Sequence, residues 1–357
     1  MRVDEPRVAI VLVLILTLGT VGGTLAAASL GGRIAGATTG DGPTDVTAPP
    51  DPASDVVGWE NGYWYNESID VNQRDGLSKH EQTVFKARTM ARVEHLTGLE
   101  FTRDVRVEYV SERELNRYIG EDVTQLPGND QLWEALFVFG EDTNASRAVY
   151  RSLTASVGGM AAEEGVDHVV IPVADPSAPQ VAHYVLAHEL VHMLQDQHYD
   201  LSQPRFHRRT LNGEMAKDSV VEGVASYVDY RYRQRCSDGA WQCVPLPADS
   251  YVGSGSPDPA FSRLMSFPYT DGRAYVQHLK EQGGWARVDS RYGDLPASVK
   301  PVIHYGAAGE TPPPIPYENT SHNGWHLADP RPTTVGEAGI YVLFWNQAAR
   351  QDRKSVV

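Results

Sequence analysis

The spacing of hydrophobic positions changes along the chain, and each spacing predicts a different element. Apolar side chains recur with helical periodicity in residues 78–96 and 181–199, so both segments are predicted to be amphipathic helices. Apolar and polar side chains alternate in 106–110, which predicts a strand. Residues 166–173 are mainly apolar, and Pro172 predicts that this second strand lies at a sheet edge or ends there. A helix, then strands, then further helices predict an α+β domain.

Other signals mark the limits of the helices. Ser78 is a helix-start residue and Gly98 a helix stop for the first predicted helix. Residues 218–226 place valines on one side and acidic side chains on the other, which predicts another helix. Residues 336–349 predict a last helix, and the chain turns polar directly after it.

The N-terminus carries the one long apolar run of the chain, residues 8–30. Its length suits a membrane-spanning helix. The three alanines at 26–28 resemble a signal-peptide cleavage site, so secretion after cleavage is the alternative. We favour a retained anchor in the cell membrane, because the run is long for a signal core. Either interpretation places the rest of the chain outside the cytoplasm.

The segments that follow predict the domain organisation. Residues 31–55 are rich in Gly, Pro, Thr and Asp and have no apolar periodicity, which is typical of a flexible linker. We expect one folded domain over residues 56–350. Residues 351–357 are expected to form a polar tail.

The charge balance excludes one class of partner. The chain has 46 acidic and 31 basic residues, which gives a net charge of −15. Nucleic acid is therefore not an expected partner, because binding phosphates needs a basic face. Only 6 of the basic residues are lysine. Few lysines and many acids are the composition expected of a protein that works in high salt.

Cys236 and Cys243 are the only cysteines. Their spacing is poor for a zinc site, which usually takes tighter pairs. In an exported chain a small loop closed by a disulfide is the better interpretation, although two free thiols remain open.

The helix predicted over 181–199 contains the sequence His-Glu-Leu-Val-His at 188–192. Positions i and i+4 of a helix lie on one face, so the two imidazoles can bind one metal ion. Zinc activates a water molecule, and the adjacent Glu189 can take its proton. The motif predicts a zinc site with His188 and His192 as ligands and Glu189 as general base.

A catalytic zinc site needs a third protein ligand, and two residues compete for this role. His198 stands where the metzincin motif HExxHxxGxxH has its third histidine, but Gln195 replaces the glycine that turns the chain back. If the helix continues, His198 points away from the metal. The alternative is Glu222 on a separate predicted helix, where the small Gly223 would allow close packing against the zinc-binding helix.

The segment His-Glu-Leu-Val-His-Met-Leu-Gln-Asp-Gln-His, followed later by Glu-Gly-Val-Ala, resembles a family of gluzincin-like metallopeptidases with HExxHxLQDQH and EGxA motifs. The resemblance covers about residues 166–305 and includes 267–276 and 283–285. It implies a zincin-like domain, Zn²⁺ as the cofactor, and Glu222 as the third zinc ligand. The chain departs from the family at Val224, where an aspartate is frequent.

Three further residues are candidates for supporting roles. Asp218 could accept a hydrogen bond from a ligand histidine and so fix its tautomer. Tyr269 and His304 are candidates for stabilising the oxyanion of a tetrahedral intermediate. The strand of 166–173, as an exposed edge, could pair with the backbone of an extended substrate.

Together these features predict a membrane-anchored zinc peptidase that hydrolyses peptides or proteins outside the cytoplasm. The first alternative is a metzincin-like site with His198 as third ligand. The second is a cell-surface binding protein whose peptidase fold is stabilised by zinc but inactive.

Overall fold

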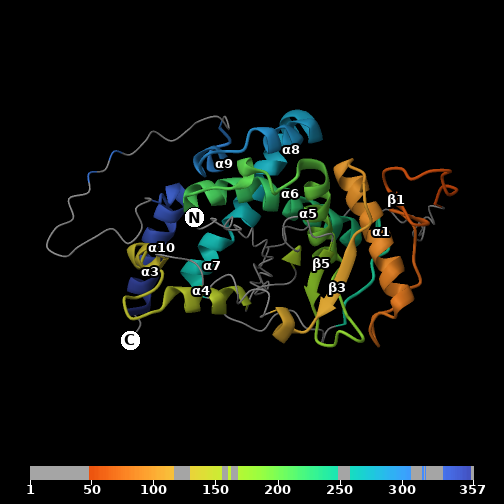
Figure 1. The fold of residues 1–357 in the computed structure, drawn as a ribbon, viewed down its shortest axis with the longest axis horizontal. Coiled ribbons are helices and arrows are strands. Elements are labelled where there is room, and N and C mark those ends of the chain that lie inside the picture. Colours follow the sequence, from red (N-terminus) through yellow and green to blue (C-terminus); the bar gives the residue numbers. More distant parts are fainter. Residues whose placement is uncertain are drawn as a thin grey trace, which may run out of the picture.

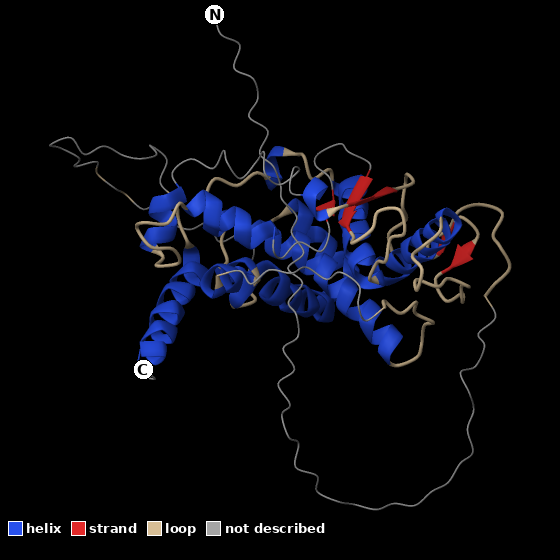
Figure 2. Ribbon diagram, turned by 90° about the horizontal axis from the view of Figure 1, so that it is seen from below, coloured by secondary structure: helices blue, strands red, loops and turns tan. Residues whose placement is uncertain are grey.

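The computed structural model describes residues 48–115, 129–154, 160–161, 168–247, 258–306, 316, 318 and 333–354. Helices dominate this part of the chain, and strands are confined to two small sheets (Figure 2). The expected α+β class is confirmed at this level. The elements are β1 (Trp59–Glu60), β2 (Tyr63–Trp64), α1 (Lys79–Thr97), β3 (Arg106–Val110), α3 (Asn129–Ala135), α4 (Ala145–Thr154), β4 (Met160–Ala161), β5 (His168–Pro172), α5 (His183–Tyr199), the 3-10 helix η1 (Pro204–Phe206), α6 (Leu211–Ser237), α7 (Pro259–Met265), α8 (Phe267–Gly293), α9 (Lys300–Ile303) and α10 (Gly336–Lys354).

The larger sheet has the order β3-β5-β4, with β3 parallel and β4 antiparallel to β5. The second predicted strand is therefore central among the described strands, so its prediction as an edge strand was wrong, whereas the alternative, that the strand ends at Pro172, is confirmed. Pro172 is tolerated because it is the last residue of β5, opposite Val110. The antiparallel neighbour β4 pairs only with Val169 and Val170. No carbonyl of β4 is therefore placed to need the backbone N–H that Pro172 lacks.

Helix α1 has the limits that its sequence signals predicted. The Ser78 hydroxyl accepts a hydrogen bond from the Glu81 backbone N–H, and the Glu81 carboxylate accepts one from the Ser78 N–H, which forms a capping box. The helix ends at Gly98, whose left-handed backbone (φ 79°) suits glycine. The start and stop residues of this helix are thus confirmed.

Helix α5 buries the apolar face that its sequence predicted, with members at Val185, Leu186, Leu190, Met193 and Leu194; Val181, also expected on this face, is buried but precedes the helix. The helix packs against α1 and α6 and against β4 and β5 (Figure 1). Each of the larger side chains contributes about 1.5–3 kcal/mol to stability by leaving water. This burial holds the His-Glu-x-x-His segment rigidly between the sheet and α6.

Helices α6 and α8 touch backbone to backbone. A Cβ atom on Gly223 of α6 would lie 2.6 Å from the carbonyl oxygen of Gly272 in α8, and a Cβ on Gly272 would lie 2.7 Å from the Ser219 carbonyl oxygen. Only glycine leaves room for such a contact. We had expected Gly223 to face α5, and this was wrong: it faces α8.

Helix α8 is interrupted at Gly283 and Gly284, whose backbone angles are not helical. The break redirects the second half of α8, and Trp285 donates its indole N–H to the carbonyl of Leu96 at the end of α1 (2.8 Å). The C-terminal half of α8 is thereby brought back towards α5, where Tyr292 stacks on Tyr199 with 3.8 Å between ring centroids.

The ends of the chain limit what the structure says about domains. Helix α10 continues to Lys354, so the first residues of the expected polar tail belong to the helix. The apolar run at residues 8–30 and most of the expected linker lie outside the described residues. Within the described part, no helix is both long and apolar enough to span a membrane.

Candidate metal centre

Two histidines of α5 and one glutamate of α6 converge on one point. His188 Nε2 lies 3.2 Å and His192 Nε2 lies 3.3 Å from the same oxygen of Glu222, Oε2. All three residues are at most 3% exposed. The structure therefore brings together the three residues expected to bind zinc.

The local geometry follows from the two helices. His188 and His192 are one turn apart on α5, and their rings lie 4.8 Å apart between centroids. Helix α6 packs along α5 and presents Glu222 to both rings. Its N-terminus is capped by Thr210, whose hydroxyl accepts a hydrogen bond from the Gly213 N–H (3.0 Å). The glutamate is thus held by a long, capped helix.

Burial and charge set the protonation of the cluster. Burial raises the pKa of a carboxyl group, but for Glu222 the two imidazoles outweigh it and hold the pKa at about 2. Burial lowers the pKa of His188. Burial also tends to lower the pKa of His192, but the charges and hydrogen bonds around its ring, those of the Glu222 carboxylate foremost, together outweigh burial, and the pKa of His192 is raised. Glu222 is therefore an ionised carboxylate at neutral pH, as a metal ligand must be.

The donor set and its spacing fit zinc. Two imidazole nitrogens and one carboxylate oxygen are the ligands of a catalytic site that keeps a fourth position open. Zinc bonds of about 2.1 Å in a tetrahedral arrangement place neighbouring ligand atoms about 3.4 Å apart. The observed separations of 3.2 and 3.3 Å between Nε2 and Oε2 are close to this value.

Glu189 is completely buried on α5 beside His188. Its negative charge helps to raise the pKa of His192, which shows that its carboxylate acts on the cluster electrostatically. A carboxylate next to a metal-activated water is the arrangement that general-base catalysis requires.

Tyr269 lies at the cluster, as expected. It lies in the first turn of α8. Its ring stacks on His188 with 6.0 Å between centroids and 18° between planes. The negative charge of Glu222 acts on its hydroxyl. Burial, followed by the charge of Glu222, raises its pKa well above the usual value. Tyr269 is therefore a neutral phenol that can only donate to the anionic cluster.

Asp218 does not make the contact that we expected. Its carboxylate lies 2.7 Å from the buried Lys217 ammonium, and no described histidine pairs with it. Lys217 also pairs with Glu214 at 2.6 Å, which explains why a charged lysine is tolerated in the interior. Asp218 is thus occupied by its neighbour in sequence.

The side chain that pairs with His192 is instead Gln195, which stands where the metzincin motif has glycine. Its side-chain oxygen lies 2.9 Å from His192 Nδ1. The available signal was the spacing. Residues three apart in a helix are neighbours, so Gln195 lies beside His192 wherever the helix continues.

Two other candidates lie elsewhere. His198 is on the continuing helix, and its Nε2 bonds to the backbone carbonyl of Glu100 (2.7 Å), so the helix carries it off the metal face as predicted. His304 follows α9 and pairs with Glu337 of α10 at 2.9 Å. It is exposed and does not join the cluster, so the structure gives no support to a catalytic role for His304.

A disulfide joins Cys236 and Cys243, with 5.6 Å between their Cα atoms. The expected pairing is confirmed. The ring nitrogen Nε2 of His183 lies 3.4 Å from Cys236 Sγ, which ties the first turn of α5 to the last turn of α6. The two helices that carry His188, His192 and Glu222 are therefore linked at one end.

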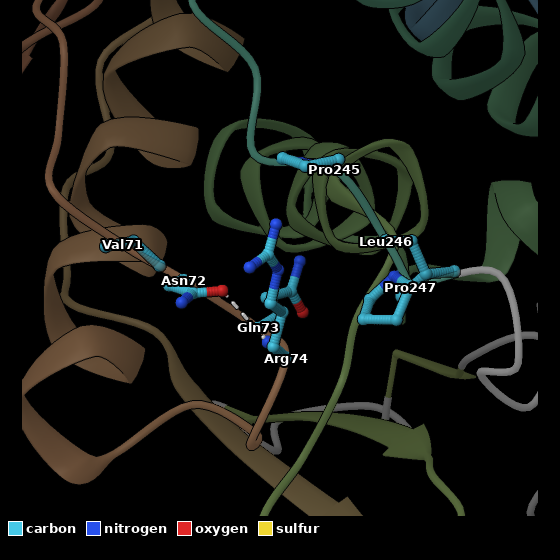
Figure 3. A pocket seen from close by; sticks show the side chains of 7 residues that line it. All are labelled: Val71, Asn72, Gln73, Arg74, Pro245, Leu246 and Pro247. Atoms are coloured by element: carbon cyan, nitrogen blue, oxygen red, sulfur yellow. Dashed lines mark hydrogen bonds between the residues drawn. The ribbon is translucent and has the colours of Figure 1, made fainter.

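A separate cavity of about 460 Å³ lies between residues 71–74 and 245–247, and none of the cluster residues lines it (Figure 3). Gln73, at its wall, donates to the Val181 carbonyl (3.0 Å) and accepts from the Val181 N–H (2.6 Å). The Gln73 amide therefore bonds to both backbone groups of Val181, as a neighbouring strand would, and positions the chain just before α5.

No protein-family model, curated protein or solved structure matches this chain.

Proposed function

We propose that the protein is a zinc-dependent peptidase, with His188, His192 and Glu222 holding the metal. The observation that carries the proposal is the convergence of two Nε2 atoms on one Glu222 oxygen in a buried position, next to the buried Glu189. Zinc bound there would supply a Lewis acid and lower the pKa of a water molecule.

The chain's own residues would then carry the proton transfers. Glu189 takes a proton from the attacking water and delivers it to the nitrogen that leaves when the peptide bond breaks. Tyr269, a neutral phenol beside the cluster, supports the proposal because it can donate a hydrogen bond where negative charge develops.

The substrate class and location are part of the same proposal. Peptides or proteins are the expected substrates, because a His-Glu-x-x-His motif with a glutamate ligand is typical of peptidases. The Cys236–Cys243 disulfide favours an oxidising compartment outside the cytoplasm. Cell fractionation followed by N-terminal sequencing distinguishes an anchored chain from a secreted one.

The test is to measure zinc and hydrolysis on the same purified chain. We expect one zinc per chain and cleavage of an unfolded protein substrate that a chelator abolishes and added zinc restores. A chain that holds zinc but cleaves nothing in a broad peptide library would overturn the peptidase and favour the zinc-stabilised binding protein.

A further inference from the structure

Gln195 occupies a buried position between three helices. It lies on α5, three residues after His192, and is 2% exposed. Its side-chain oxygen faces His192 Nδ1 at 2.9 Å. Its side-chain nitrogen donates to the Val221 carbonyl of α6 and to the Tyr292 hydroxyl of α8, both at 2.8 Å.

These contacts determine which way the amide points. A backbone carbonyl can only accept, so the NH₂ end of Gln195 must face Val221. The carbonyl end must then face His192, and because it too can only accept, His192 Nδ1 must carry a proton. The remaining ring nitrogen, Nε2, is the one directed at Glu222. The orientation therefore follows from the Val221 carbonyl.

We propose that Gln195 is a positioning residue that holds His192 in the tautomer protonated on Nδ1, leaving Nε2 to bind the metal. The inference rests on the proposed metal site and adds the residue that prepares one of its ligands. Such a partner fixes the ring orientation of a ligand histidine and raises its basicity.

The surroundings of Gln195 make it a firm support. Tyr292 stacks on Tyr199 and Tyr199 donates to Asp289 (3.0 Å), so the hydroxyl that receives the Gln195 N–H is itself held. The other acceptor, Val221, directly precedes Glu222. One amide therefore sets the position of His192 relative to the backbone that carries the third ligand.

Zinc affinity of the full chain, measured by competition with a chromophoric chelator, tests the proposal. Q195M keeps the size of the side chain and removes its hydrogen bonds, and it should weaken zinc binding about 10–100-fold. Q195E, as the neutral acid in this buried position, keeps an acceptor towards Nδ1 and a donor towards the Val221 carbonyl, and should remain within a few-fold of the parent. Parental affinity in Q195M, or equal losses in both variants with unchanged thermal stability, would overturn the proposal.

The Nδ1 proton gives a second measurement that does not depend on catalysis or on zinc. In ¹⁵N-histidine-labelled, metal-free chain, the His192 Nδ1–H should be protected from exchange, with H192Q supplying the assignment. Q195M should lose this protection and Q195E should keep it. An unprotected Nδ1–H in the parent would contradict the proposal. A protected Nδ1–H in a chain without peptidase activity would refute the proposed function alone.

Discussion

Gly223 and Gly272 meet where α6 and α8 cross, so closely that a Cβ on Gly223 would lie 2.6 Å from the Gly272 carbonyl oxygen. Gly223 follows Glu222 directly, and Gly272 is about one turn beyond Tyr269. The contact of the two glycines therefore sets how far α6, with Glu222, lies from the first turn of α8, with Tyr269.

G223A should push α8 away from α6. We expect a loss of about 1–3 kcal/mol in the free energy of unfolding, because a methyl group is forced against backbone atoms. Tyr269 should separate from Glu222, and activity should fall by more than the stability loss explains. Urea unfolding and kcat measure the two effects. G293A is the matched control, because a Cβ there meets no atom within 4 Å; it should be as stable and active as the parent.

E222A should lose zinc, because it removes one of three protein ligands and leaves two buried imidazoles facing a void. H198A should retain zinc, because that ring bonds to the Glu100 carbonyl away from the cluster. The zinc content of the two purified variants decides whether Glu222 or His198 is the third ligand. Full zinc in E222A together with none in H198A would support the metzincin alternative instead.

E189Q should bind zinc as the parent does and lose about 10²–10⁴-fold in kcat, because only the proton acceptor is removed. Zinc content and kcat on one preparation are the measurements. An E189Q variant that cleaves as fast as the parent would rule out Glu189 as the base.

Y269F should retain zinc and lose about 10²–10³-fold in kcat, with little change in KM, if the hydroxyl stabilises charge in the transition state. The ring remains, so its stacking on His188 is preserved. A variant with parental kcat would show that Tyr269 only packs. Y305F, an exposed tyrosine outside the cluster, is the control.

The stability of the antiparallel pair β1–β2, which contains Glu60, should fall with rising pH. Burial, followed by the charge of Glu94, raises the pKa of Glu60 to about 9, against an ordinary value of 4.5. Between these values the folded chain keeps a proton that the unfolded chain has lost. This contribution to stability is therefore complete below pH 4.5 and is lost as the pH approaches 9.

E60Q should flatten this dependence, because an amide cannot ionise and can still donate to Glu94. Urea unfolding at several pH values is the measurement, and E112Q, at an exposed carboxylate, is the control. A parent whose stability is constant from pH 5 to 9 would contradict the raised pKa of Glu60.

Local signals in the sequence were sufficient for much of the fold and for two of the three cluster residues, His188 and His192. The period of apolar residues, the Ser78 cap and the Gly98 stop act within a few residues, so they predicted α1 and α5 correctly. The spacing of His188 and His192 required only a helix. The departure of His198 from their face required only that the helix continue, and it does.

Tertiary packing decided the rest, because the relevant partners are far apart in the chain. Whether β5 is central depended on β3 and β4 pairing on both its sides. Gly223 could be recognised as small, but only the fold showed that it meets Gly272. Asp218 and Gln195 both had the chemistry to support a histidine. Asp218 pairs with Lys217 instead. Gln195 donates to the Val221 carbonyl of α6, and this contact orients its amide oxygen towards His192.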